Sequence, residues 1–323
     1  MQKHIIFFTL GTPQNGMGHI VRCITLADQL KQRGAHVEFV TLQNTPGWTR
    51  LMQTQHPVRG VAEVGDMLTA YTGHADAIVI DVEHGPDRAM LERARELYPC
   101  VINIGGVGWA MQDPDALDNL VDLQIYQSVL NDAPPNPRRL VGVEYMMINP
   151  AYAACMPDYE RGQVVVSFGG SDPHKLTAPT VAALAGISRD CSAIIGGAAE
   201  FSDYSVGVRF VHSPPSIVGE LVGASLSILQ MGMTAYESLA AGVPCLLVNL
   251  SKDHERTSVE LERLGCAINM GVWDEFNPQT LRERVEYLLA RPDELRGMGA
   301  LGAALVDGKG AARVADKVME FVK

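Results

Sequence analysis

The chain has 323 residues, of which 47% are hydrophobic and 20% are charged. This length is long for one hydrophobic core and is sufficient for two domains. The formal net charge of −11 argues against a broad surface that tracks nucleic-acid phosphates. The six cysteines include no Cys-x-x-Cys pair, and no apolar run is long enough to span a membrane. We therefore expect reduced thiols and a cytoplasmic protein.

The N-terminal half is organised around a strand, a glycine-rich loop and a helix. The apolar run 5–10 has the length of a buried strand, and Gly11, Gly16 and Gly18 follow it. Apolar residues then recur at helical spacing from about His19 onward. This is the first unit of a βαβ domain, where a ligand can approach the backbone and a helix N-terminus favours anions.

Two polar side chains of this half are candidates for catalysis. The imidazole of His19 at the mouth of the first helix can accept a proton at physiological pH, unless it only caps that helix. Asp81 ends the apolar run 75–81. At the carboxyl end of a parallel strand it would face the crevice in which such sheets bind ligands. The alternative for Asp81 is a helix cap or a turn acid.

The remaining pattern alternates strands and helices in both halves of the chain. Further strands of the first half are expected at 35–41, 58–61, 100–104, 121–126 and 139–142, with helices at 45–55 and 86–97. In the second half, strands are expected at 163–167, 191–195, 208–212, 225–229, 245–249 and 266–270, before a mostly helical tail over 278–323.

This alternation predicts two doubly wound, Rossmann-like α/β domains that face a cleft, the default ligand site. The stretch 149–161 contains two prolines and little periodicity, so we expect it to be a linker between domains 1–148 and 162–323. The last helix is a candidate for packing back on the N-terminal domain.

Two loops of the second half each lead from a strand into a helix. They are expected to place two helix N-termini around one polyanion, with Ser171 and Thr234 as hydroxyl donors to a pyrophosphate. The residues of this predicted phosphate site are Gly169, Gly170, Ser171, Gly232, Met233 and Thr234.

Glu237 lies three residues after Thr234 and therefore on the same helix face. A carboxylate at this position can accept hydrogen bonds from both hydroxyls of a ribose. The alternative is a solvated helix acid stabilised by the helix dipole.

Four segments resemble a known family: GMGHIVRCITLA (16–27), GVEYMMINPAYA (142–153), VSFGGSDPHKLT (166–177) and GMTAYESLAAGVPCLLV (232–248). They are similar to the UDP-sugar hydrolases of the pseudaminic acid pathway and to the related spore-coat polysaccharide glycosyltransferase-like proteins. The resemblance implies a glycosyltransferase fold of type B (GT-B) that needs no metal. It also implies a nucleotide in the C-terminal domain with Glu237 on the ribose, and His19 as the general base.

The chain departs from the family on the side of the donor sugar. Asp81-Val82-Glu83 stands where the family has Asp-x-Tyr, and Asp253-His254 replaces an Asn-Gln pair. The phosphate loop also has Met231 and Met233 in place of small residues. The nucleotide half and His19 therefore carry over from the family, but the sugar and the acceptor do not. Candidates for the sugar and acceptor side are Gly16, Gly18, Arg22, Glu83, Asp253 and His254.

These observations predict an inverting, metal-independent enzyme that transfers the sugar of a UDP-sugar to a hydroxyl acceptor. The acceptor classes considered are a glycan, a small metabolite and a hydroxymethylated DNA base, the last requiring a basic strip around Arg22, Arg33, Arg50 and Arg59. Alternatives are a UDP-sugar hydrolase with water as acceptor and a non-catalytic sugar-nucleotide binding protein. A nicotinamide enzyme is disfavoured because the first loop lacks Gly-x-Gly-x-x-Gly. No His, Cys and carboxylate cluster has metal-ligand spacing, and no cofactor is expected.

Overall fold

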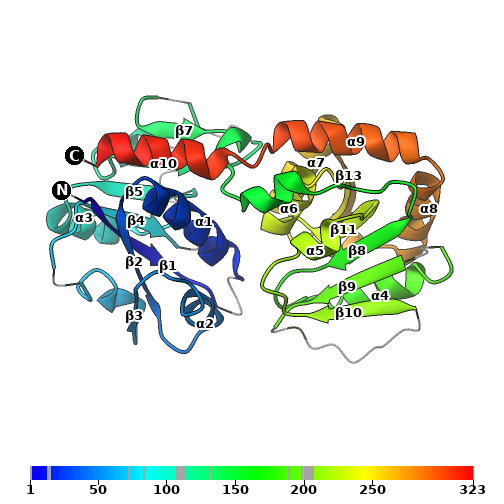
Figure 1. Ribbon diagram of the computed structural model, residues 1–323, viewed down its shortest axis with the longest axis horizontal. Coiled ribbons are helices and arrows are strands. Elements are labelled where there is room, and N and C mark those ends of the chain that lie inside the picture. Colours follow the sequence, from blue (N-terminus) through cyan, green and yellow to red (C-terminus); the bar gives the residue numbers. More distant parts are fainter. Residues whose placement is uncertain are drawn as a thin grey trace. The chain divides into compact units, whose positions relative to one another are not determined.

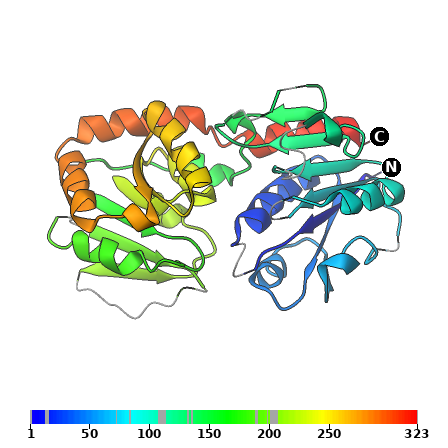
Figure 2. The same ribbon diagram turned by 180° about the vertical axis from the view of Figure 1, so that it is seen from behind.

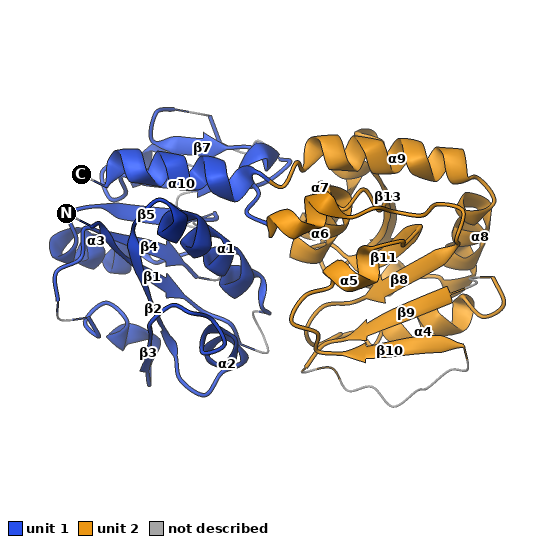
Figure 3. Ribbon diagram, in the orientation of Figure 1, with its two compact units in different colours: residues 1–148, 309–323 blue, residues 149–308 orange. Residues whose placement is uncertain are grey.

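The computed structural model describes residues 2–12, 16–71, 73–82, 85–106, 114–130, 133–134, 136–187, 190–197, 199 and 207–322. The chain divides into two compact units, of which unit 1 comprises residues 1–148 and 309–323 and unit 2 residues 149–308 (Figure 3). Residues 149–161, expected to be a linker, are part of unit 2, where Pro150–Ala154 forms a 3-10 helix.

Unit 1 is built on a parallel sheet of seven strands within its described residues, in the order β3-β2-β1-β4-β5-β6-β7. The strands are β1 (His4–Thr9), β2 (His36–Leu42), β3 (Val58–Val61), β4 (Ala77–Asp81), β5 (Val101–Ile104), β6 (Leu123–Tyr126) and β7 (Arg139–Val141). The central strands are covered on both faces, which explains why β1 and β4 read as almost unbroken apolar runs.

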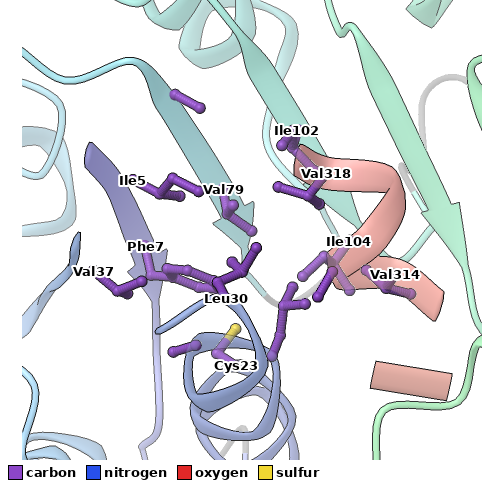
Figure 4. Packing of buried hydrophobic residues seen from close by; sticks show 14 of the residues in the cluster. Ile5, Phe7, Cys23, Leu30, Val37, Val79, Ile102, Ile104, Val314 and Val318 are labelled. Carbon is purple, nitrogen blue, oxygen red and sulfur yellow. The ribbon is translucent and has the colours of Figure 1, made fainter. Parts of the chain in front are cut away.

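The helices of unit 1 cover both faces of this sheet. On one face, α1 (Gly18–Gln32) and α10 (Gly310–Phe321) lie side by side (Figure 1). Val314 and Val318 of α10 pack into the same core as Phe7 of β1 and Leu30 of α1 (Figure 4). The other face is covered by α3 (Arg88–Leu97), seen in the view from behind (Figure 2). Leu91 of α3 packs with residues of β1 and β4.

A shorter helix than expected, α2 (Pro46–Leu51), follows β2. Thr45 caps its first turn by accepting a hydrogen bond from the Trp48 N–H at 3.1 Å. The expected helix over 45–55 was too long, because the hydroxyl of Thr54 donates to the Leu51 carbonyl at 2.7 Å and competes with helix continuation.

Unit 2 contains a second parallel sheet, with six strands in its described residues in the order β10-β9-β8-β11-β12-β13. The strands are β8 (Gln163–Ser167), β9 (Asp190–Ile195), β10 (Val208–His212), β11 (Leu226–Gln230), β12 (Cys245–Asn249) and β13 (Ala267–Val272). The helices are α4 (Thr177–Ala183), α5 (Val218–Leu221), α6 (Met233–Ala240), α7 (Lys252–Arg263), α8 (Pro278–Leu289) and α9 (Pro292–Leu305).

Strand order reverses once in each sheet, between β1 and β4 in unit 1 and between β8 and β11 in unit 2. In such sheets, ligands bind outside the carboxyl ends of the strands at this switch point. Asp81 pairs with Thr9 at the ends of β4 and β1, and Ser167 pairs with Leu229 at the ends of β8 and β11. The topology therefore places the predicted catalytic groups and the predicted phosphate loops at the two switch points.

Among the described residues, no helix combines the length and the apolar character needed to cross a membrane. All six cysteines are free thiols, five of them buried.

Candidate active site

The side chains of His19 and Asp81 meet at the switch point of unit 1. The Nδ1 atom of His19 lies 2.6 Å from Oδ1 of Asp81, which is fully buried, whereas 19% of the His19 side chain is exposed. Met17 is the N-cap of α1, so His19 does not cap the helix. Asp81 is likewise neither a helix cap nor a turn acid, because it is the last residue of β4 and bonds to α1.

The buried carboxylate of Asp81 favours one tautomer of His19. Burial alone would raise the pKa of the Asp81 carboxyl, but the charge of Arg22 and hydrogen bonds from Arg22 and His19 outweigh it and hold that pKa well below its usual range. The ionised carboxylate can only accept a hydrogen bond, so its 2.6 Å contact favours the tautomer in which Nδ1–H of His19 is the donor. Nη2 of Arg22, which can only donate, also lies 2.9 Å from Nδ1. The lone pair of neutral His19 is then on Nε2, the nitrogen that can accept a proton from a substrate.

Arg22 holds the carboxylate of Asp81 from the same helix. Its Nε donates to Oδ2 at 2.6 Å and its Nη2 to Oδ1 at 2.5 Å. The thiol of Cys23 donates to Oδ2 at 3.2 Å, and burial followed by the nearby Asp81 charge raises the pKa of this thiol well above its ordinary value. Asp81 is thus held by three side chains of α1, which fixes the plane of its carboxylate against His19.

The role of Arg22 differs from the expected one, and that of Cys23 was not foreseen. Arg22 was expected on the sugar and acceptor side, but its guanidinium is paired with Asp81. The signal was present in the sequence, since Arg22 and Cys23 follow His19 by three and four residues and so share its helix face. Gly16 has a φ of +69°, which permits the turn before α1, and Gly18 is the first residue of that helix. Glu83 lies outside the described residues.

In unit 2, the loop after β8 turns at Gly169 and packs against the end of β11. Gly169 has a φ of +75°, and a Cβ there would lie 2.4 Å from Nε2 of Gln230. The left-handed backbone conformation therefore favours glycine here, whereas the amide end of Gln230 could shift to make room for a Cβ. Oε1 of Gln230 is buried and has no hydrogen-bond partner among the described residues. Gly170 is exposed and Ser171 is partly exposed at the tip of this turn.

The start of α4 is occupied by a side chain of the protein itself. The Asp172 carboxylate accepts hydrogen bonds from the backbone N–H groups of Leu176 at 2.8 Å and Thr177 at 3.0 Å. The expectation that two helix N-termini face one polyanion is therefore wrong for α4, because a carboxylate already takes its N–H groups and would repel a phosphate.

The start of α6 differs from that of α4. Gly232 is its N-cap in an extended conformation, and no side chain caps the helix within the described part of the chain. Met233 and Thr234 form its first turn and are partly exposed. The N-terminal N–H groups of α6 and the Thr234 hydroxyl therefore form an arrangement that can bind an anion.

Glu237 is buried on α6, with 7% of its surface exposed. Burial raises the pKa of its carboxyl to about 7, although a hydrogen bond from the Tyr152 hydroxyl partly opposes this. Glu237 is therefore not the solvated helix acid that was its alternative interpretation. A buried carboxyl with unfilled acceptor capacity is costly unless a ligand or partner supplies hydrogen-bond donors.

The remaining predicted residues of unit 2 are on the surface. Asp253 and His254 are exposed in the first turn of α7, where the His254 N–H donates to the capping Ser251 hydroxyl at 3.3 Å. Met231 is buried after β11.

Two parallel, doubly wound sheets with polar groups at both switch points define the GT-B glycosyltransferase fold, and solved structures confirm this assignment. The spinosyn forosaminyltransferase SpnP superposes with a TM-score of 0.69 over 100% of both chains at 15% identity. The glycosyltransferase VinC, solved in complex with DTDP, has a TM-score of 0.65 over 99% of each chain at 13% identity.

The chain is also similar in sequence to the spore coat polysaccharide biosynthesis protein SpsG of Bacillus subtilis (strain 168). The two are 24% identical over 330 residues, which cover 96% of each protein. This relative confirms the resemblance to the spore-coat polysaccharide proteins that the four motifs indicate. No family model matches the chain.

Proposed function

We propose that the protein is an inverting, metal-independent glycosyltransferase that takes a sugar from a UDP-sugar and passes it to a hydroxyl acceptor. The observation that carries this proposal is the 2.6 Å contact between His19 Nδ1 and the buried Asp81 at the switch point of unit 1. A histidine oriented by a buried carboxylate is an arrangement suited to deprotonating a hydroxyl.

In this mechanism, unit 1 activates the acceptor. Nε2 of His19 takes the proton of the acceptor hydroxyl as its oxygen attacks the anomeric carbon, and the bond from that carbon to the UDP oxygen breaks. Asp81 stabilises the imidazolium that forms, and Arg22 keeps Asp81 ionised. A single displacement on the face opposite to UDP inverts the configuration at the anomeric carbon.

Unit 2 binds the nucleotide. The uncapped start of α6 and the Thr234 hydroxyl would bind the diphosphate, where they offset the negative charge that develops on the leaving group. Glu237 would accept hydrogen bonds from the ribose hydroxyls, in addition to the one that its buried carboxyl accepts from Tyr152. The complex of VinC with DTDP supports a diphosphate nucleotide as ligand. Because a diphosphate is a good leaving group, the reaction needs little acid catalysis.

A glycan is the acceptor class that the relatives favour, since SpsG is named for polysaccharide biosynthesis. A modified DNA base is a less favoured acceptor, because three of the four arginines that would form the necessary basic strip are already paired. Arg22, Arg33 and Arg59 are each paired with an acidic side chain, which reduces the positive charge available to phosphates.

The proposal is tested by following UDP release from a panel of UDP-hexoses and UDP-N-acetylhexosamines. Each donor is incubated first in buffer alone and then with oligosaccharides, small alcohols or DNA containing hydroxymethylated bases. UDP release that stays slow until an acceptor is added supports a transferase, and mass spectrometry identifies the glycosylated acceptor. Rapid release in buffer would instead assign a UDP-sugar hydrolase, and tight binding with no release under any condition would leave a non-catalytic binding protein.

A further inference from the structure

Two histidines and a glutamate gather at the opposite edge of the sheet of unit 1, where β1 and β2 begin. His4 and His36 are register partners on these parallel strands, and Glu38 follows His36 by two residues, so all three side chains project from one face. One ligand atom from each side chain lies within 4.8 Å of the others. No local spacing in the sequence indicates this cluster, because its members come together only through the pairing of two strands.

The Nε2 atom of the His4 ring faces this cluster. Nδ1 lies 3.2 Å from the backbone carbonyl of His74, which can only accept a hydrogen bond, and 3.1 Å from the Tyr71 hydroxyl, which can donate or accept. When Nδ1–H donates to the carbonyl, the lone pair of the ring is on Nε2. Nε2 is buried and has no hydrogen-bond partner among the residues that the structure describes. A histidine whose other ring nitrogen donates to a backbone carbonyl has the outer contact typical of metal-ligating histidines.

Glu38 also has one side-chain atom on an outer partner and one that faces the cluster. One of its carboxylate oxygens, Oε1, faces Nε of Arg59 at 3.4 Å, while the other, Oε2, faces Nε2 of His4 at 3.8 Å. Ligand atoms around a tetrahedral zinc ion are about 3.4 Å apart, so the His4–Glu38 pair needs to close by only a few tenths of an ångström. His36 is exposed and would provide the third ligand from the rim.

The geometry points to a binding site for a divalent transition-metal ion of the zinc type, with His4, His36 and Glu38 as ligands. Two imidazoles and one carboxylate are a ligand set that zinc accepts, with the remaining position open to water. The site is structural, because β1 runs from His4 at this edge to Thr9 beside Asp81, a length of about 16 Å. A bound ion would tie the starts of β1 and β2 together and would not contact the predicted catalytic groups.

The test uses the full chain, stripped with EDTA and desalted, and titrated with zinc in competition with a chromophoric chelator. We expect one zinc ion per chain, and a rise in the melting temperature of about 3 °C or more at saturating zinc. His36→Ala and Glu38→Gln should each weaken binding at least about tenfold. Because His36 is exposed, His36→Ala should melt like the wild type when zinc is absent.

His212→Ala is the matched control, because His212 is an exposed strand histidine in unit 2. It should bind zinc like the wild type. Failure of the wild type to bind zinc saturably would overturn the assignment and would leave His4 and Glu38 as an ion pair only. Equal zinc binding by the wild type and His36→Ala would also overturn it, because the ion would then be elsewhere.

Discussion

The substitution Asp81→Asn tests the proposed base most sharply, because it keeps the size of the side chain and removes its charge. Asp81 is fully buried and accepts hydrogen bonds from His19 and from two nitrogens of Arg22. Loss of the carboxylate charge frees His19 to carry its proton on Nε2, the nitrogen whose lone pair is needed to accept a proton. We expect the turnover number to fall by about two to four orders of magnitude, the usual contribution of a positioned general base.

The same substitution should destabilise unit 1, because it leaves the charge of Arg22 unpaired at a largely buried position. Breaking a buried ion pair from one side costs about 3–5 kcal/mol. Asp81 has a lowered pKa when folded, so its contribution is complete above the unfolded value of about 4 and is lost as the pH falls through the folded value. The difference in unfolding free energy between the wild type and Asp81→Asn should therefore be constant above about pH 4, the unfolded pKa.

Turnover is measured at saturating donor and acceptor at a temperature where both proteins are folded by circular dichroism. Asp118→Asn is the control, because it removes one acid from Arg139, another buried arginine of unit 1, while Asp115 still pairs with that arginine. This control should lose some stability and keep its turnover number. A folded Asp81→Asn protein with a turnover number close to that of the wild type would refute the role of the carboxylate in orienting His19.

Further predictions concern the nucleotide and the absence of a catalytic metal. In isothermal titration calorimetry, Glu237→Ala should weaken UDP binding by about 10- to 100-fold, which is the cost of losing charged hydrogen bonds to a ribose. The control Glu283→Ala, on an exposed helix face, should bind UDP like the wild type. Unchanged UDP affinity in Glu237→Ala would contradict the assignment. Because burial raises the pKa of Glu237 to about 7, UDP affinity should increase from pH 5 to pH 8 as the carboxyl ionises. The wild type should also lose about 3 kcal/mol of unfolding free energy relative to Glu237→Gln as the pH rises from about 4.5 through 7, because in this range the folded state binds more protons than the unfolded state. Unfolding in urea measures this difference. The same dependence of stability on pH in both proteins would contradict a raised pKa of Glu237. EDTA should leave turnover unchanged, because N–H groups and not a metal are proposed to bind the diphosphate; a loss that magnesium restores would show that the phosphate site is misassigned.

Most of the fold could be predicted from the sequence, because strands buried on both faces of a parallel sheet read as short apolar runs. The strand, glycine loop and helix from residue 5 to Leu30 were found in this way, as was the second sheet, whose first strand begins at Gln163. The resemblance to spore-coat polysaccharide proteins was also available from the motifs alone.

The parts of the candidate site that the sequence did not predict depend on contacts between distant side chains. Arg22 could serve a substrate or a carboxylate, and only the pairing of β1 with β4 places Asp81 beside it. Asp172 could face a phosphate or cap a helix, and the turn after β8 decides for the cap. His4 and His36 are 32 positions apart, so no local spacing indicates their proximity.

The proposed role of His19 in activating the acceptor of a UDP-sugar-dependent transfer is tested most directly by His19→Asn. Turnover and UDP affinity are measured on the same preparation, with the exposed His212→Asn as control. Because the nucleotide is proposed to bind to unit 2, UDP affinity should stay at the wild-type value while turnover falls by about two to four orders of magnitude. A His19→Asn protein that turns over UDP-sugar at close to the wild-type rate would contradict the role of His19 as the base.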